Sequence, residues 1–156
     1  MIHVALYQPA IPPNTGNVAR QCVGMKAHLH IIGPTKFEVS DTNAKRAGLD
    51  YWDDLTLSLY DSPEDFLGWL GERRPYLVTK FGAVRYDQPG YADGDVLLFG
   101  NENTGLPEDW RKRWETSCLY VPIPGPVRSY NLSNTAAIVL AQASLKAGLL
   151  EDHQLI

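Results

Sequence analysis

The chain has 156 residues, 44% of them hydrophobic, and a formal net charge of −4. This length fits one globular domain over residues 1–156 with a sizeable core, and no apolar run is long enough to cross a bilayer. We therefore expect a cytoplasmic protein without a membrane partner, and the negative charge argues against nucleic-acid binding unless positive side chains gather on one face.

The first half of the chain alternates between strand and helix patterns. Strands are predicted over residues 2–8, 29–32 and 55–60. Helices are predicted over 14–26, opened by Asn14 and Thr15, over 41–48, and from Ser62 to Gly71. Serine at an N-cap followed by proline is a strong helix start, and glycine is the usual residue just past a helix end.

The second half continues the alternation. Strands are predicted over 76–80, 96–99 and 119–123, and helices over 107–114 and 131–147. This order predicts an α/β fold with a mostly parallel sheet and helices on both faces. The last helix is apolar nearly all round and rich in alanine, so it is either deeply buried or covered by a second copy, and we favour a homodimer face.

Two polar loops follow predicted buried strands. Residues 100–107 carry two glycines, and residues 121–134 carry three prolines and a run of small polar side chains. Loops at the ends of parallel strands form the ligand crevice in such folds. Each glycine or proline alone is also ordinary turn chemistry, but two such loops together indicate a small-molecule pocket.

Several common sites are missing from the sequence. The first strand is not followed by a dinucleotide-binding glycine pattern, and the chain has neither a phosphate-binding Walker loop nor a hydrolase nucleophile elbow. His28 and His30 alternate on one predicted strand and could hold a metal ion, but no third ligand is near them in sequence. We therefore expect no metal.

Three segments in order resemble the motifs of the SPOUT RNA methyltransferases. They are residues 14–20 (NTGNVAR), 99–107 (FGNENTGLP) and 121–134 (VPIPGPVRSYNLSN). The opening residues 6–17 and the segment Arg46–Tyr51 are most similar to the short TrmL-type members of that family, which methylate the ribose 2′-oxygen of the tRNA wobble nucleotide, a cytidine or modified uridine at position 34. The resemblance covers nearly the whole chain.

The resemblance implies a C-terminal trefoil knot, a homodimer, and S-adenosylmethionine as methyl donor without any metal. It places the donor in loops that follow three strands. The cofactor-binding residues it implies are Leu77, Val78, Gly100, Glu102, Val121, Ile123, Ser129 and Leu132. Glu102 has two open interpretations, since it either holds Arg20 or a ligand amine in place or caps a loop or helix.

Arg20 matches the arginine of the first motif and is the implied catalytic residue. Because arginine stays protonated, it is a poor candidate for a base. We expect it to orient a phosphate and to stabilise negative charge that develops on the ribose oxygen. The alternative is a phosphate anchor or ion pair on the surface.

The substrate implied by the resemblance is the anticodon stem-loop of tRNA. The candidate contacts are Lys80, Arg128, Asn131 and Arg46, although Arg128 is equally compatible with a solvated loop charge. Tyr130 either stacks on a base or belongs to the core, and residues 111–113 are interpreted as a solvated helix face. Two other functions stay open: methylation at another RNA position, and binding of cofactor or RNA without catalysis.

Overall fold

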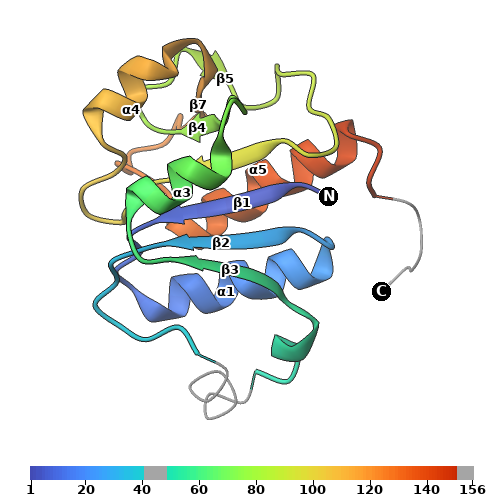
Figure 1. Cartoon of the computed structure of the whole chain (residues 1–156). Coiled ribbons are helices and arrows are strands. Elements are labelled where there is room, and N and C mark those ends of the chain that lie inside the picture. The colour runs from blue at the N-terminus through green and yellow to red at the C-terminus, as the bar shows by residue number, and fades with distance from the viewer. Residues whose placement is uncertain (41–48, 151–156) are drawn as a thin grey trace.

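The computed structural model describes residues 1–40 and 49–150, and the predicted helix over 41–48, with Arg46, lies outside them. One seven-stranded sheet has helices on both faces (Figure 1), which confirms the predicted α/β fold. The strands are β1 (His3–Tyr7), β2 (His28–Ile32), β3 (Thr56–Tyr60), β4 (Tyr76–Val78), β5 (Val84–Arg85), β6 (Val96–Phe99) and β7 (Cys118–Tyr120). The helices are α1 (Pro12–Gly24), α3 (Pro63–Leu70), α4 (Glu108–Arg113) and α5 (Leu132–Lys146), with short 3-10 turns η1 (Trp52–Asp54) and η2 (Glu115–Ser117).

Every pair of neighbouring strands in this sheet is parallel, in the order β3-β2-β1-β6-β4-β7-β5. Parallel strands are buried on both faces, and β6 accordingly has four buried residues in a row. The edge strand β3 is half-exposed, as its alternating pattern predicts. The described residues contain no helix of the length and apolarity that a membrane crossing needs.

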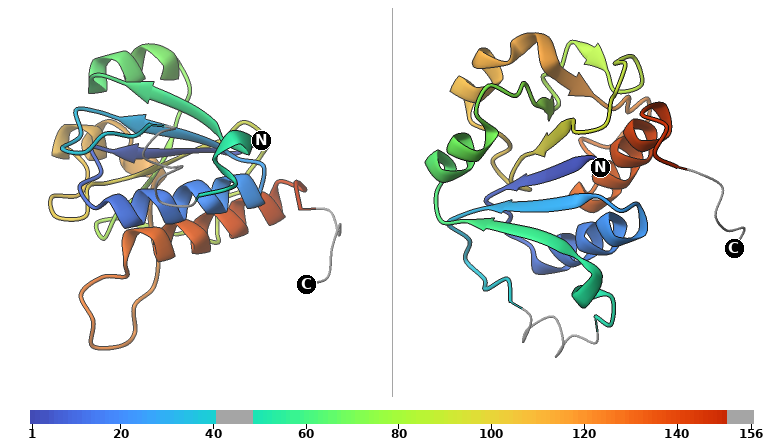
Figure 2. Two further views of the ribbon diagram at one scale, coloured as in Figure 1. Left: turned by 90° about the horizontal axis from the view of Figure 1, so that it is seen from below. Right: turned by 45° about the vertical axis from the view of Figure 1, so that its right-hand side comes forward.

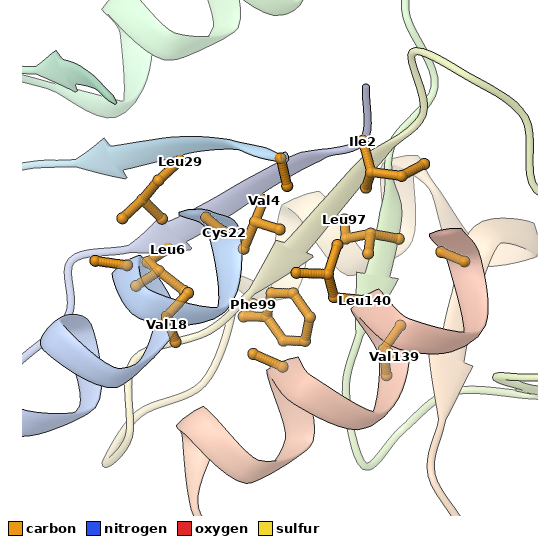
Figure 3. Packing of buried hydrophobic residues seen from close by; sticks show 14 of the residues in the cluster. Ile2, Val4, Leu6, Val18, Cys22, Leu29, Leu97, Phe99, Val139 and Leu140 are labelled. Carbon is orange, nitrogen blue, oxygen red and sulfur yellow. The ribbon is translucent and has the colours of Figure 1, made fainter. Parts of the chain in front are cut away.

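Two apolar cores lie on opposite faces of the sheet. Helices α1 and α5 run side by side across one face (Figure 2), and Figure 3 shows Val18 and Cys22 of α1 and Val139 and Leu140 of α5 packed against strand side chains. Helices α3 and α4 cover the other face, through Phe66 and Trp110 among others. Because side chains alternate along a strand, every strand except β5 supplies both cores.

Several element boundaries differ from the sequence prediction, and β4, for example, ends at Val78 and not at residue 80. Helix α1 begins at Pro12, two residues before Asn14, because prolines in the first helical turn lose no intrahelical hydrogen bond. Strand β7 ends at Tyr120 because the alternating prolines that follow, beginning with Pro122, cannot donate to a strand ladder. The two-residue strand β5 was not predicted, and it pairs with β7.

Strand β7 lies between β4 and β5, although those two strands follow each other in sequence. Val78 and Val84 both register with Leu119, from opposite sides, and only residues 79–83 join them. This connection therefore crosses β7. At the crossing a Cβ on Gly82 would lie 2.3 Å from the carbonyl carbon of Leu119, so the backbones are too close for any residue but glycine.

Candidate functional site

The carboxyl ends of β4, β6 and β7 meet at one edge of the sheet. Val78 registers with Phe99 on one side and with Leu119 on the other, and the Thr79 N–H donates to the Leu119 carbonyl at 2.9 Å. Three loops leave this edge: residues 79–83, 100–105 and 121–131. The edge is therefore a crevice position of the type in which open parallel sheets bind ligands.

The loop over residues 100–105 is a tight turn closed by its own backbone. Asn101 and Gly105 exchange two backbone hydrogen bonds, of 3.2 and 2.9 Å, and the Asn101 side chain accepts from Asn103 N–H and Thr104 N–H. Gly105 has φ +70°, and a Cβ on Gly100 would lie 2.5 Å from the carbonyl carbon of Gly105. Both glycines are thus required by the shape of the turn.

Glu102 fastens this turn to the start of α1. Its carboxylate accepts from the N–H groups of Ala10 (2.8 Å) and Ile11 (3.1 Å) and from the Asn14 side-chain amide (3.3 Å). Burial by itself raises the pKa of Glu102, but the hydrogen bonds outweigh it and hold the pKa below its ordinary value. Of the two interpretations left open above, the geometry favours the cap, because these donors, and not Arg20, engage the carboxylate.

Asn131 fastens the third loop to the same place. It is the N-cap of α5, because its side-chain oxygen accepts from Ser133 N–H at 2.8 Å and from Asn134 N–H at 3.4 Å. Its amide donates to the Asn14 side-chain oxygen at 2.9 Å. Asn14, buried inside α1, therefore bridges Glu102 and Asn131, and one polar chain ties the starts of both helices to the glycine turn.

The third loop stands out from the body of the protein. The left view of Figure 2 shows the segment between β7 and α5 projecting beyond the helices. Its residues 124–131 are exposed, while Val121 and Ile123 at its base are half-buried. Tyr130 is expected either to stack on a base or to belong to the core. It is 38% exposed and its hydroxyl donates to the Pro122 carbonyl, so it is not a core residue.

Two open hollows flank the base of this loop and share Val121 and Pro122. The first, of about 450 Å³, is lined by Lys80, Tyr120, Val121, Pro122, Ile123 and Pro124. The second, of about 440 Å³, is lined by Arg85, Tyr86, Asp87, Val121, Pro122, Tyr130 and Ile138. Volumes of this size are typical of small-molecule sites. The apolar side chains of Val121 and Ile123 in the first hollow suit contact with a flat heteroaromatic ring.

The predicted cofactor residues fall into two groups. Val78, Gly100, Val121 and Ile123 lie at the carboxyl edge, where their strands meet. Leu77 is fully buried, so its side chain supports this edge from within the core. Further out, Ser129 is exposed on the projecting loop, and Leu132 is half-buried in the first turn of α5.

Arg20 lies on the exposed side of α1. Its guanidinium carbon lies 5.6 Å from the ring centroid of Tyr51, whose hydroxyl donates to the Gly16 carbonyl at 3.0 Å. Within residues 1–40 and 49–150 no ion pair includes Arg20. Its donors are therefore open to an anionic ligand, while stacking on Tyr51 limits the positions the side chain takes.

A cluster of two cationic side chains around one aromatic ring was not predicted from the sequence. Phe81 is 62% exposed, the guanidinium of Arg111 lies 4.3 Å from its ring centroid, and the ammonium of Lys80 lies 5.2 Å from it. Residues 111–113 were interpreted as a plain solvated face, which is wrong for Arg111. An aromatic residue directly after Lys80 was the available signal, but the partner from α4 becomes evident only in the fold.

Comparison with known proteins shows similarity to RNA methyltransferases. The model of the SpoU rRNA Methylase family matches residues 1–141. A tRNA (cytidine(34)-2′-O)-methyltransferase of Methylovorus glucosotrophus is 38% identical over 144 residues, which are 92% of this chain and 94% of that protein.

Solved structures agree in fold. A structure described in terms of the 2-OH methylation of C/U34 on tRNA superposes with a TM-score of 0.85 at 40% identity, covering 94% of this chain and 95% of the other. The AdoMet-bound rRNA methyltransferase of Sinorhizobium meliloti has a TM-score of 0.81 at 27% identity, covering 96% of this chain and 57% of the other.

Proposed function

Because the chain belongs to the SpoU rRNA methylase family, we propose that it moves a methyl group from S-adenosylmethionine to the ribose 2′-oxygen of nucleotide 34, a cytidine or a modified uridine, in tRNA. The named relative and the superposed structure support this choice of substrate. The observation that carries the proposal is the meeting of three loops at the carboxyl edge of β4, β6 and β7, beside a hollow of suitable size. The substrate implies action in the cytoplasm.

The hollow fits the donor in chemical terms. Val121 and Ile123 offer apolar contact to an adenine ring, and backbone groups near Val78 and Gly100 are assigned the hydrogen bonds to its edge. Ser129 and Leu132 are assigned to the methionine end, and Glu102 holds the glycine turn in shape. When bound, the donor supplies a methyl group on a positively charged sulfur. No metal is needed for this transfer.

Arg20 is assigned the chemical role at the acceptor oxygen. A ribose hydroxyl is a poor nucleophile until negative charge builds on its oxygen, and a positioned cation lowers the energy of that charge. Arginine keeps its own proton, so it stabilises charge and orients a phosphate. The hydroxyl proton passes to water as the carbon–oxygen bond forms and the carbon–sulfur bond of the donor breaks, which leaves a neutral thioether. Its exposed place above Tyr51, without an anionic partner among the described residues, suits this role.

Contacts with the anticodon stem-loop are assigned to positive and aromatic side chains around the hollow. Lys80 lines it, Arg128 lies on the projecting loop, and Asn131 lies at that loop's end. Phe81 with Arg111 adds a surface on which an unpaired base can stack. Arg46 is a further candidate outside the described residues.

We also propose a homodimer, with the C-terminal segment threaded into a knot as the family implies. The inner face of α5 is buried against the sheet, but Ala137, Ile138 and Ala141 are only half-buried and Leu145 is 62% exposed. These residues form one apolar stripe on the outer face. Ala141→Glu would place a charge in the stripe, and we expect light scattering to show a monomer with greatly reduced methyl transfer.

The decisive experiment is to incubate purified protein with S-adenosylmethionine and unmodified tRNA and to map the product by nucleoside mass spectrometry. We expect one 2′-O-methyl group, at nucleotide 34, and its loss from cells that lack the gene. A methyl group at another nucleotide would move the assignment to another RNA site. If the donor binds in calorimetry but no RNA is methylated, the chain is a binding module.

A further inference from the structure

Three of the chain's four histidines gather on one face of the sheet. His3 opens β1, His28 opens β2 in register with it, and His30 follows two residues later, so all three side chains point to the side covered by α3. His30 is fully buried and the other two are half-buried. The indole of Trp69 packs against two of them, with its ring centroid 5.2 Å from that of His3 and 4.2 Å from that of His30.

Two of the three imidazoles are held by a hydroxyl partner on one ring nitrogen. His30 Nδ1 pairs with the Tyr60 hydroxyl at 2.9 Å, and His28 Nε2 pairs with the Ser58 hydroxyl at 2.8 Å. Oxygen partners of this kind fix the orientation of metal-binding imidazoles in known sites. One nitrogen from each of the three rings lies within 4.8 Å of the others, which is close enough for a single ion.

The strongest observation is the direct contact between His3 Nδ1 and His30 Nε2, which lie 2.9 Å apart and share one proton. Two nitrogens bound to one tetrahedral zinc ion lie about 3.3 Å apart, given bonds of about 2.0–2.1 Å. The pair therefore needs to open by only a few tenths of an ångström to hold an ion in place of the proton.

We propose that His3, His28 and His30 form a binding site for a divalent ion of the zinc type, with three imidazole ligands and water in the fourth position. Imidazole is a ligand preferred by zinc, copper and nickel, and hard cations such as Mg²⁺ prefer oxygen. On binding, the shared proton moves to the other nitrogen of its own ring, so both rings stay neutral.

The site is separate from the proposed chemistry of the chain. It lies at the amino ends of β1 and β2, whereas the loops of the candidate active site leave the carboxyl ends of the strands. Its position suggests that a bound ion ties β1 to β2 beneath α3 and stabilises the fold.

The test is to strip the purified protein with a chelator and to titrate it with Zn²⁺ in competition with a chromophoric chelator. We expect one ion per chain, and at least tenfold weaker binding in His3→Gln and in His28→Gln, which replace the two half-buried rings. His153→Ala is the matched control, because His153 is the remaining histidine, and its affinity should equal that of the wild type. Co²⁺ should give the strong visible absorption of a four-coordinate site.

Circular dichroism checks that each variant is folded, and donor binding by calorimetry should be unchanged in all of them. The proposal is overturned if His3→Gln and His28→Gln bind Zn²⁺ as tightly as the wild type, or if no ion binds at equimolar concentration. A loss of zinc binding in His153→Ala alone would also overturn it, by placing the site elsewhere. None of these results depends on methyl transfer.

Discussion

The carboxyl edge of the sheet and the amino ends of β1 and β2 present polar groups in different ways. At the carboxyl edge the loops offer backbone groups from glycine- and proline-rich segments, and the side chains there, such as Glu102 and Asn131, hold the loops in shape. At the amino ends three imidazoles on rigid strands offer ring nitrogens directly, and Trp69 packs against two of them.

Ligand binding at the two regions should therefore be lost through different kinds of substitution. A site built from backbone is lost when the turn changes shape, even though no ligand-contacting side chain is removed. A site built from side chains is lost when one ring is replaced, while the strand beneath it stays in place. Substitutions at each end of the sheet separate these cases.

The largest effect is expected at Arg20, the side chain that is assigned direct contact with the substrate. Arg20→Ala should lower the rate of methyl transfer by about 10²–10³-fold, the size reported for loss of one charge-stabilising donor. Donor affinity in calorimetry should not change. Arg113→Ala, on the exposed face of α4, is the control, and equal rates in the two variants would remove Arg20 from the chemistry.

Next in size is the glycine turn. Gly100→Ala places a Cβ 2.5 Å from the Gly105 backbone, so the turn must move, at a cost of about 1–3 kcal/mol in the free energy of unfolding. Donor affinity should fall at least tenfold. Gly68→Ala in α3 meets no atom within 4 Å and should instead stabilise the fold by up to about 1 kcal/mol. Unchanged donor affinity in Gly100→Ala would show that the turn does not shape the site.

Low pH should destabilise the protein through the histidines His3 and His30. Burial, followed by neighbouring positive charge from the other histidines and Arg73, lowers the pKa of His30 to about 3, and burial lowers that of His3 to about 4. The unfolded chain binds these protons near pH 6.5, so the unfolded state holds more protons between pH 6.5 and 4. The free energy of unfolding should therefore fall as the pH drops, by about 1.4 kcal/mol per pH unit for each proton.

Urea denaturation of metal-free protein at pH 7, 6 and 5 measures this slope. Buried His30 should contribute most, and half-buried His3 less because solvent screens its charge. His30→Gln should flatten the slope, whereas His153→Ala should leave it as in the wild type. Equal slopes in wild type and His30→Gln would contradict the prediction.

The smallest effect is expected at Phe81. Loss of one stacked base weakens single-stranded RNA binding by about 1–3 kcal/mol in favourable cases, and for an exposed ring we expect the lower end, about fivefold. Phe81→Ala should show this loss in a filter-binding assay with tRNA, and Phe81→Tyr should retain affinity. If both variants bind tRNA as the wild type does, the aromatic ring lies outside the RNA surface.

Much of the fold could be predicted because local signals agreed with it. Ser62 caps α3 with its side chain, Asn131 caps α5, and Gly71 ends α3 with φ +57°. The parallel sheet followed from the alternation of strands and helices. The start of α1 was misplaced because Asn14 has the residue type of a cap, while its real partners, Glu102 and Asn131, are distant in sequence.

The candidate site could be predicted only in part. The loops were located through motif resemblance, but the polar chain that joins them depends on contacts between residues about a hundred positions apart. The third histidine was missed for the same reason, since His3 reaches His28 only through strand pairing. Spacing along a chain reports neighbours within one element and says little about neighbours across a sheet.

The crossing at Gly82 has a consequence for the order in which the protein is made. Residues 76–85, which form the arch over β7, are synthesised before Leu119. The residues of the arch are therefore present before the strand that runs beneath it has been synthesised. The projecting loop and α5 follow β7 in the chain, so the candidate active site is completed only after the rest of the sheet has been synthesised.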